Sequence, residues 1–219
     1  MNITTHHIEV TKNARFAMYG EPSEKTKYFW IVLHGSKMLC EQMIYKFVDF
    51  DPKIHFVIAP EGMNKFYSKG FSGDIVASWM TSRDRLFEIN DFSNYLSKLY
   101  NQYLDKLPSS VRKIALGFSQ GGTTMYRWLH HEQISIDVAL GYSCWIPEDI
   151  DLKTGKTDLS NLKLVYTYGE QDQFFNIDLI NKMQVVVQKN ELDLKIIPYS
   201  GDHRVDREQL KFLFDNYIK

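Results

Sequence analysis

Cysteine is scarce in this chain of 219 residues, which has only Cys40 and Cys144. The two lie far apart and neither belongs to a CxxC pair, so the sequence predicts buried free thiols in a reducing compartment. No group of His, Cys, Asp and Glu residues has the spacing of metal ligands. A metal-dependent hydrolase is therefore not expected, and no metal site is predicted.

An excess of one charge is also missing. The net charge is −1, and the 26 basic and 27 acidic residues are interspersed, which excludes a basic stripe for nucleic acid. No apolar run approaches the roughly 18–20 residues that span a bilayer. The N-terminal stretch MNITTHHIEV lacks the basic and apolar regions of a signal peptide. We therefore expect a cytoplasmic protein with no membrane span and no nucleic-acid partner.

Repeats, low-complexity tracts and linkers rich in Pro, Gly or Ser are absent as well. Single α/β domains commonly reach this length, and 44% hydrophobic residues supply a large core. The sequence therefore predicts one domain over residues 1–219, as a monomer or a homodimer.

Short apolar runs alternate with longer stretches of helical spacing. Nearly continuous Val, Ile and Leu runs are typical of parallel strands that are covered on both faces. Strands are predicted at residues 28–34, 55–60, 111–117, 136–143, 162–169 and 192–199. Helices are predicted at residues 38–49, 86–105, 121–131, 174–190 and 205–217. Residues 4–19, where HHIEV and RFAMYG flank TKNA, predict an antiparallel hairpin at the edge of the sheet. The prediction is a mixed α/β sheet with helices on both faces, whose ligands bind beyond the carboxyl ends of the strands.

The segment GFSQG places Ser119 between Gly117 and Gly121, after a predicted strand and before a predicted helix. A serine at such a sharp turn stands clear of the sheet, and its small neighbours let strand and helix approach each other. GFSGD (70–74) and GYSCW (141–145) lack the final glycine and that context. Ser119 is therefore the predicted nucleophile.

A serine hydroxyl needs a base to take its proton and a carboxylate to orient that base. On this type of fold the order along the chain is Ser, then Asp or Glu, then His. His203 follows the last predicted strand and is the predicted base. Asp172 follows the strand before it and is the favoured acid, although Glu170 remains an alternative. Asp202 is a poor candidate because adjacent side chains on an extended segment point to opposite sides.

Two backbone N–H groups are expected to stabilise the oxyanion. One belongs to Gln120, directly after the nucleophile, and the second to the turn LHGSKM (33–38), where Ser36 is our choice. The neighbouring His34 is expected to be a structural hydrogen bonder. Four aromatic residues near strand ends are candidates for the wall of an acyl pocket: Trp79, Phe118, Trp145 and Phe174. Met63, Phe66 and Tyr67 are candidates for a mobile flap.

The motifs LHG, APEG, SWMTSRD, GFSQGG, YGEQD and SGDH occur in the order and spacing typical of the phospholipase/carboxylesterase family of α/β-hydrolases. From about residue 28 to 215 the chain resembles this family, to which acyl-protein thioesterases belong. The resemblance implies an α/β-hydrolase fold and esterase or thioesterase chemistry on short to medium acyl chains, with no cofactor. The chain departs from the pattern in LHGSKM, which lacks the second glycine of LHGxGD, and in APEG, where an AP-x-x-P-like loop is usual. The usual nearby proline is also missing after Asp172.

We therefore expect a serine hydrolase that cleaves a small-molecule acyl ester or thioester through an acyl-enzyme intermediate. Two alternatives remain open. One is a ligand-binding protein of the same fold that does not catalyse, and the other is a serine peptidase.

Overall fold

The computed structural model describes residues 2–174 and 177–219. Its central sheet contains β1 (Phe16–Tyr19), β2 (Tyr28–Leu33), β3 (His55–Pro60), β6 (Arg112–Phe118), β7 (Val138–Tyr142), β8 (Lys163–Gly169) and β9 (Leu194–Tyr199). Their order across the sheet is β1-β3-β2-β6-β7-β8-β9. Neighbouring strands in this sheet run parallel except for the pair β1 and β3. The predicted mostly parallel sheet is confirmed, and so are the six predicted strands.

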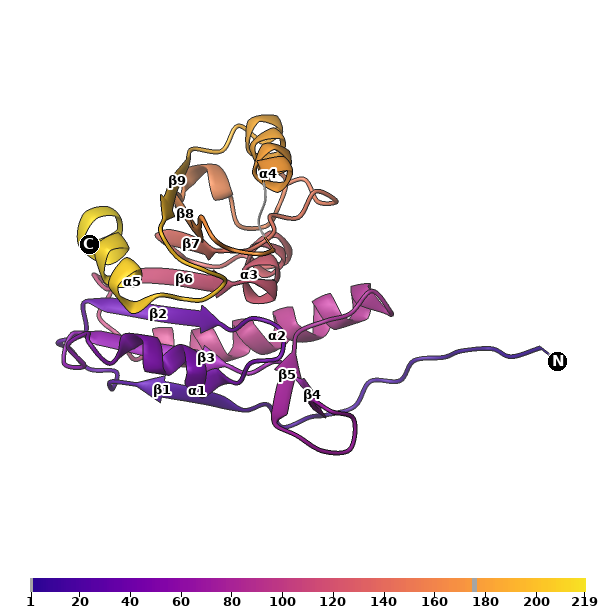
Figure 1. Ribbon diagram of the computed structural model, residues 1–219. Coiled ribbons are helices and arrows are strands. Elements are labelled where there is room, and N and C mark those ends of the chain that lie inside the picture. The colour runs from indigo at the N-terminus through magenta and orange to yellow at the C-terminus, as the bar shows by residue number, and fades with distance from the viewer. Residues whose placement is uncertain (1, 175–176) are drawn as a thin grey trace.

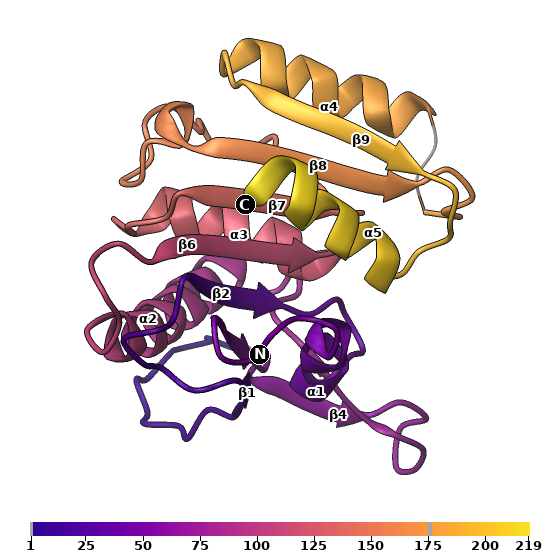
Figure 2. The same ribbon diagram turned by 90° about the vertical axis from the view of Figure 1, so that its left-hand side faces the viewer.

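Helices cover both faces of this sheet (Figures 1 and 2). They are α1 (Cys40–Ile44), α2 (Arg85–Leu104), α3 (Gln120–His131), α4 (Ile177–Lys189) and α5 (Arg207–Leu213). A 3-10 turn at Tyr45–Phe47 extends α1, and a π-helical turn at Phe214–Ile218 extends α5. The predicted helices are confirmed, although residues 175 and 176 of the predicted helix 174–190 lie outside the described residues. Within the described ranges, no helix combines the length and the apolar character needed to cross a membrane.

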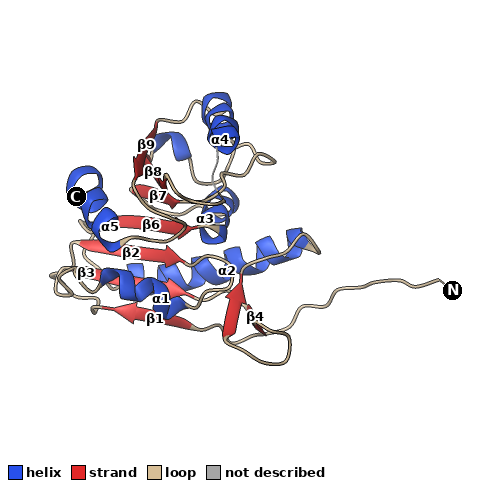
Figure 3. Cartoon of the chain, viewed as in Figure 1, coloured by secondary structure: helices blue, strands red, loops and turns tan. Residues whose placement is uncertain are grey.

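The core lies in two layers, one on each side of the sheet, because successive strand side chains point to opposite faces. In β2, Phe29, Ile31 and Leu33 belong to the layer on the face that α2, α3 and α4 cover. Trp30 and Val32 belong to the layer on the opposite face, which α1 and α5 cover. Figure 3 shows the strands enclosed between the helices. The sheet is therefore buried on both faces, which accounts for its continuous apolar runs.

The N-terminal edge differs in part from the prediction. β1 pairs antiparallel with β3, which confirms an antiparallel edge. The other expected arm of the hairpin, residues 6–10, forms no strand, and its side chains are exposed. Figure 1 shows this segment extending away from the sheet. A strand that buries no apolar side chains gains too little free energy to offset the conformational entropy lost when it becomes ordered.

A second, two-stranded sheet was not predicted. β4 (Asn64–Tyr67) and β5 (Ile75–Ser78) form an antiparallel hairpin. Its connection contains the GFSGD segment, in which Gly70 and Gly73 have φ angles of 78° and 88°. Met38 bridges to Ala77 of β5. The loop that follows β2 is therefore fixed against this hairpin.

Candidate active site

The residues singled out in the sequence gather beyond the carboxyl ends of the parallel strands, where open α/β sheets bind ligands. His34 directly follows β2, and Ser119 directly follows β6. Asp172 comes three residues after the end of β8, and His203 comes four residues after the end of β9. The carboxyl ends of the strands thus bring together a hydroxyl, two imidazoles and a carboxylate.

Ser119 occupies the sharp turn between β6 and α3. Its backbone has φ 51° and ψ −123°, a conformation that non-glycine residues seldom adopt and that surrounding structure must hold in place. Ser119 caps the N-terminus of α3, and its own N–H donates to Tyr142 O at 3.0 Å. The turn therefore presents the hydroxyl at the positive end of a helix.

Gly121 allows α3 to approach the end of β2. A Cβ atom at this position would lie 2.4 Å from Leu33 O and 2.5 Å from His34 O, closer than any real contact. Only glycine fits without moving backbone atoms. This approach places the start of α3 directly beside the loop that follows β2.

His203 joins the serine to the aspartate. Its Nε2 lies 3.1 Å from Ser119 Oγ, and its Nδ1 lies 2.6 Å from Asp172 Oδ2. An ionised carboxylate only accepts hydrogen bonds, so Nδ1 carries the hydrogen and Nε2 is free to accept one from the serine hydroxyl. This tautomer is the one that a general base for Ser119 requires.

Asp172 is held for this task by burial and by a second hydrogen bond. Its side chain is fully buried, and its Oδ1 accepts the Phe174 N–H at 2.9 Å. The two alternatives are placed differently. Asp202 is exposed and pairs with Arg204, while the side chain of Glu170 is exposed. The geometry favours Asp172 over both.

Of the two expected oxyanion donors, Gln120 directly follows this serine and Ser36 belongs to the loop after β2. Among the described residues, neither the Ser36 N–H nor the Gln120 N–H has a hydrogen-bond acceptor. Gln120 N–H belongs to the first residue of α3, where no intrahelical acceptor exists. Gly35 lies against the nucleophile, since a Cβ atom on it would come within 3.2 Å of Ser119 Cβ. The loop after β2 therefore borders the position where an oxyanion would form.

The four aromatic candidates occupy different positions. Phe118 is buried beneath His203, with ring centroids 4.9 Å apart, and Phe174 contacts the same imidazole at 4.7 Å. Phe174 is 63% exposed and offers a surface to a substrate. Trp145 is partly buried, and its carbonyl accepts the Thr123 hydroxyl. Trp79 is only 2% exposed.

Trp79 connects the loop after β2 to the first residue of α3. Its indole N–H donates to His34 O at 2.8 Å, and its backbone N–H donates to Gln120 Oε1 at 3.1 Å. Gln120 Oε1 also accepts the Ser78 hydroxyl, and its Nε2 donates to Met80 O. Sequence patterns did not single out these side-chain contacts of Gln120 and Ser78, because they depend on tertiary packing.

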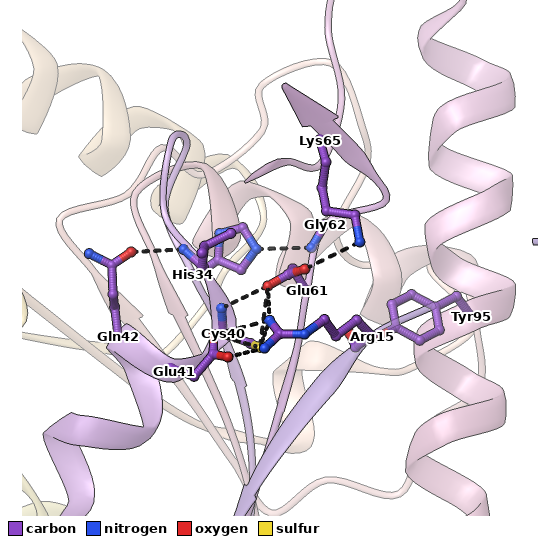
Figure 4. Close-up of polar contacts among 10 residues, drawn as sticks. Arg15, His34, Cys40, Glu41, Gln42, Glu61, Gly62, Lys65 and Tyr95 are labelled. Atoms are coloured by element: carbon purple, nitrogen blue, oxygen red, sulfur yellow. Dashed lines mark hydrogen bonds and ion pairs between the residues drawn. The ribbon is translucent and has the colours of Figure 1, made fainter. Parts of the chain in front are cut away.

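A second polar cluster lies behind the loop after β2 (Figure 4). Cys40, Glu41 and Glu61 bring their Sγ and carboxylate oxygens within 4.8 Å of one another, which sequence spacing did not predict. The guanidinium of Arg15 lies among them, 2.7 Å from Glu61 and 3.3 Å from Cys40 Sγ, and it also pairs with Glu41. Arg15 therefore supplies a positive charge to this cluster, and Lys65 Nζ lies 3.6 Å from the other oxygen of Glu61. The buried Glu61 directly follows β3, a position that marks it as a candidate functional residue.

The candidate flap residues lie at the β4–β5 hairpin. Phe66 and Tyr67 belong to β4 and are half-exposed, and they line a hollow of about 500 Å³ together with Leu39. Met63 precedes β4, and its carbonyl accepts a hydrogen bond from Lys12. Their movement as a flap stays a prediction.

A mostly parallel sheet with helices on both faces, carrying a serine at a strand-to-helix turn, defines an α/β-hydrolase. The chain belongs to the phospholipase/carboxylesterase family, whose model matches residues 17–218. It is accordingly a hydrolase of the esterase/thioesterase type. No curated protein sequence matches the chain significantly.

Solved structures share the fold. The esterase PE8 superposes with a TM-score of 0.71 at 16% identity, covering 95% of this chain and 100% of that one. Acyl-protein thioesterase 2 from Zea mays gives 0.69 at 17% identity, covering 93% and 97%. A phospholipase/carboxylesterase from Dyadobacter fermentans gives 0.69 at 12% identity, covering 96% and 99%. At these identities the likeness concerns the fold.

Proposed function

We propose that Ser119, His203 and Asp172 form a catalytic triad that hydrolyses carboxylic esters or thioesters of short to medium acyl chains. The observation that carries this proposal is the unbroken hydrogen-bond chain from Ser119 Oγ through both nitrogens of His203 to Asp172. These residues come from three separate loops, at sequence distances of 84 and 31 positions.

In the acylation step, Ser119 Oγ attacks the acyl carbonyl carbon while His203 Nε2 takes the hydroxyl proton. Asp172 stabilises the resulting imidazolium and keeps its orientation. The tetrahedral intermediate then collapses, the bond to the alcohol or thiol breaks, and His203 donates its proton to that leaving group. Water then repeats these steps. His203 takes one proton from the water, and the remaining hydroxide attacks the carbonyl carbon of the acyl-enzyme. His203 returns the proton to Ser119 Oγ, which leaves as the acid is released. No cofactor takes part in these steps.

The N–H groups of Ser36 and Gln120 are proposed to stabilise the oxyanion in both steps. Both are free of other acceptors within the described part of the chain, and Gln120 adds the positive end of α3. Such donors act on charge that develops only in the transition state, and each is worth a few kcal/mol.

Phe174, Trp145, Phe118 and Trp79 are proposed as the apolar surroundings of the acyl chain. The exposed ring of Phe174, in contact with His203, supports this proposal most directly. The similarity to an acyl-protein thioesterase fold adds thioesters to the substrates worth testing. We place residues 1–219 in a single domain that acts in the cytoplasm on a small-molecule substrate, as a monomer or homodimer.

The test compares p-nitrophenyl acetate, butyrate and octanoate, an acyl thioester, and a matched p-nitroanilide, using the wild type and Ser119→Ala. We expect ester and thioester turnover that the mutation abolishes, with little turnover of the anilide. Efficient anilide cleavage would favour a peptidase. If a fluorophosphonate fails to label Ser119 and no ester is turned over, the protein binds ligands without catalysis, and the proposed function is wrong.

A further inference from the structure

His34 uses both nitrogens of its imidazole on backbone groups. Figure 4 shows its contact with Gly62. It is fully buried directly after β2. The Gly62 N–H donates to its Nε2 at 2.9 Å, so Nε2 carries no hydrogen. The hydrogen is therefore on Nδ1, which donates to Gly35 O at 2.7 Å. One tautomer satisfies both contacts.

The contact with Gly35 fixes one peptide group of the loop. In a trans peptide the C=O and the following N–H point in opposite directions, and the described residues contain no cis peptide bond. Because Gly35 O faces the imidazole, the Ser36 N–H points away from it. Rotation of this peptide would break the 2.7 Å bond and would turn a carbonyl oxygen toward the site.

We propose that His34 is a positioning residue that holds the Gly35–Ser36 peptide with its N–H directed at the developing oxyanion. This role rests on the proposed function of Ser119. The hydrogen bond to Gly35 O also polarises the peptide, which makes the Ser36 N–H a stronger donor. His34 thereby acts on the transition state without touching the substrate.

The surroundings of His34 keep it in place. Its carbonyl accepts the indole N–H of Trp79, whose backbone N–H is tied to Gln120. Gly62 follows Glu61, a buried carboxylate anchored by Arg15 and by the Cys40 N–H. Gly62, which donates to Nε2, and Gly35, which accepts from Nδ1, therefore lie in two segments that other hydrogen bonds hold in place.

Burial lowers the pKa of His34. The neutral form persists as a result, and only the neutral form has an unprotonated Nε2 that can accept from Gly62. This electrostatic effect agrees with the tautomer that the hydrogen bonds require.

Two substitutions separate the contacts of the imidazole. In His34→Asn the amide nitrogen occupies the place of Nδ1 and keeps the donor to Gly35 O. In His34→Gln the amide oxygen occupies the place of Nε2 and keeps only the acceptor for Gly62. We expect kcat/KM on p-nitrophenyl butyrate to fall less than ~10-fold for Asn but ~10²–10³-fold for Gln, the range for loss of one oxyanion donor. The loss should lie in kcat with KM nearly unchanged.

A trifluoromethyl ketone, whose adduct with serine carries an oxyanion, provides the second readout. Its affinity should fall in His34→Gln in proportion to kcat/KM and stay near the wild-type value in His34→Asn. His55→Asn is the matched control, because His55 is also a buried histidine with one indole hydrogen bond, at the opposite end of the sheet. It should lower stability and leave kcat/KM and ketone affinity unchanged.

Equal losses in His34→Asn and His34→Gln, or losses that follow only the unfolding temperature, would overturn the role. If His34→Gln does not fold, proton NMR of the wild type decides. Forming the ketone adduct should move the Ser36 amide and the His34 Nδ1 protons downfield together, and an unchanged His34 resonance contradicts the proposal. If a fluorophosphonate does not label the wild type, the proposed function of Ser119 itself is wrong, and the role of His34 is not the cause.

Discussion

His203 and Asp172 lie 31 positions apart in the sequence, and in the structure His203 Nδ1 is 2.6 Å from Asp172 Oδ2. The carboxylate is fully buried, and its other oxygen accepts the N–H of Phe174. Within residues 2–174 and 177–219, the buried carboxylate of Asp172 accepts hydrogen bonds from these two donors. The pair therefore fixes both the tautomer and the direction of the imidazole.

Replacing Asp172 by Asn should nearly abolish catalysis while the fold is retained. An asparagine can present an N–H to His203 Nδ1, which places the histidine hydrogen on Nε2, where it cannot take the Ser119 proton. We expect kcat on p-nitrophenyl butyrate to fall about 10³–10⁴-fold, with little change in KM. Steady-state kinetics beside circular dichroism would measure both.

Asp202→Asn and Glu170→Gln are the controls for this substitution. Both carboxylates are exposed and neither contacts His203, so each variant should keep kcat within about threefold of the wild type. If either control lost most of its kcat while Asp172→Asn stayed active, Asp172 would not be the acid of the triad.

The sheet and the order of the site residues could be predicted because they depend on local patterns. Continuous apolar runs identify strands buried on both faces, and the GFSQG segment identifies the turn that carries Ser119. Ser119, Asp172 and His203 follow from the chain order of this fold and from their positions after strands. No assumption about side-chain packing is needed for these inferences.

Other features depend on packing that the sequence does not display. β4 and β5 have four residues each and little alternation, so their hairpin was missed. Residues 6–10 alternate between polar and apolar side chains but pair with no strand, so only β1 of the expected hairpin formed. The place of Trp79 at a substrate wall stays a prediction, whereas its contacts with His34 and Gln120 were not predicted. Its aromatic character is visible in the sequence, and its hydrogen bonds are not.

Gly121→Ala should inactivate the enzyme. Its Cβ would meet Leu33 O at 2.4 Å and His34 O at 2.5 Å, so α3 must move away from the loop after β2. We expect a loss of about 1–3 kcal/mol in the free energy of unfolding and at least a 100-fold loss in kcat. Urea unfolding and ester hydrolysis would measure these effects.

Gly70→Ala is the matched control for that variant. Gly70 lies in the β4–β5 hairpin with φ 78° and no atom within 4 Å of an added Cβ. The left-handed backbone should cost about 1–2 kcal/mol, and the kinetics should not change. Comparable activity in the two alanine variants would show that the approach of α3 is not required.

Neither thiol should react in the folded protein. Cys40 and Cys144 are both buried, and burial raises the pKa of each thiol well above its usual range. The thiolate is the reactive form, so DTNB should label neither residue until guanidinium unfolds the chain, when both react. Iodoacetamide should leave esterase activity intact while a fluorophosphonate removes it. Rapid labelling of the native protein with loss of activity would point to a cysteine nucleophile.

Stability should fall as the pH is lowered from about 6.5 to about 4, partly because of His55. Burial, as the largest cause, lowers the pKa of His55 from 6.5 to about 4, and its Nδ1 accepts the indole N–H of Trp30. Between these values the unfolded chain binds a proton that the folded chain does not. The free energy of unfolding therefore rises with pH in this window, and the contribution of His55 is fully present above it.

One pKa unit corresponds to about 1.4 kcal/mol, so His55 alone accounts for a loss of about 3 kcal/mol across the window. His34, whose pKa burial also lowers, acts in the same direction. His55→Asn can still accept from Trp30 but does not titrate. Urea unfolding at pH 7, 6, 5 and 4 should show the stability difference between wild type and variant shrinking as the pH falls. Parallel stability curves would mean that His55 takes up its proton equally in the folded and unfolded chains.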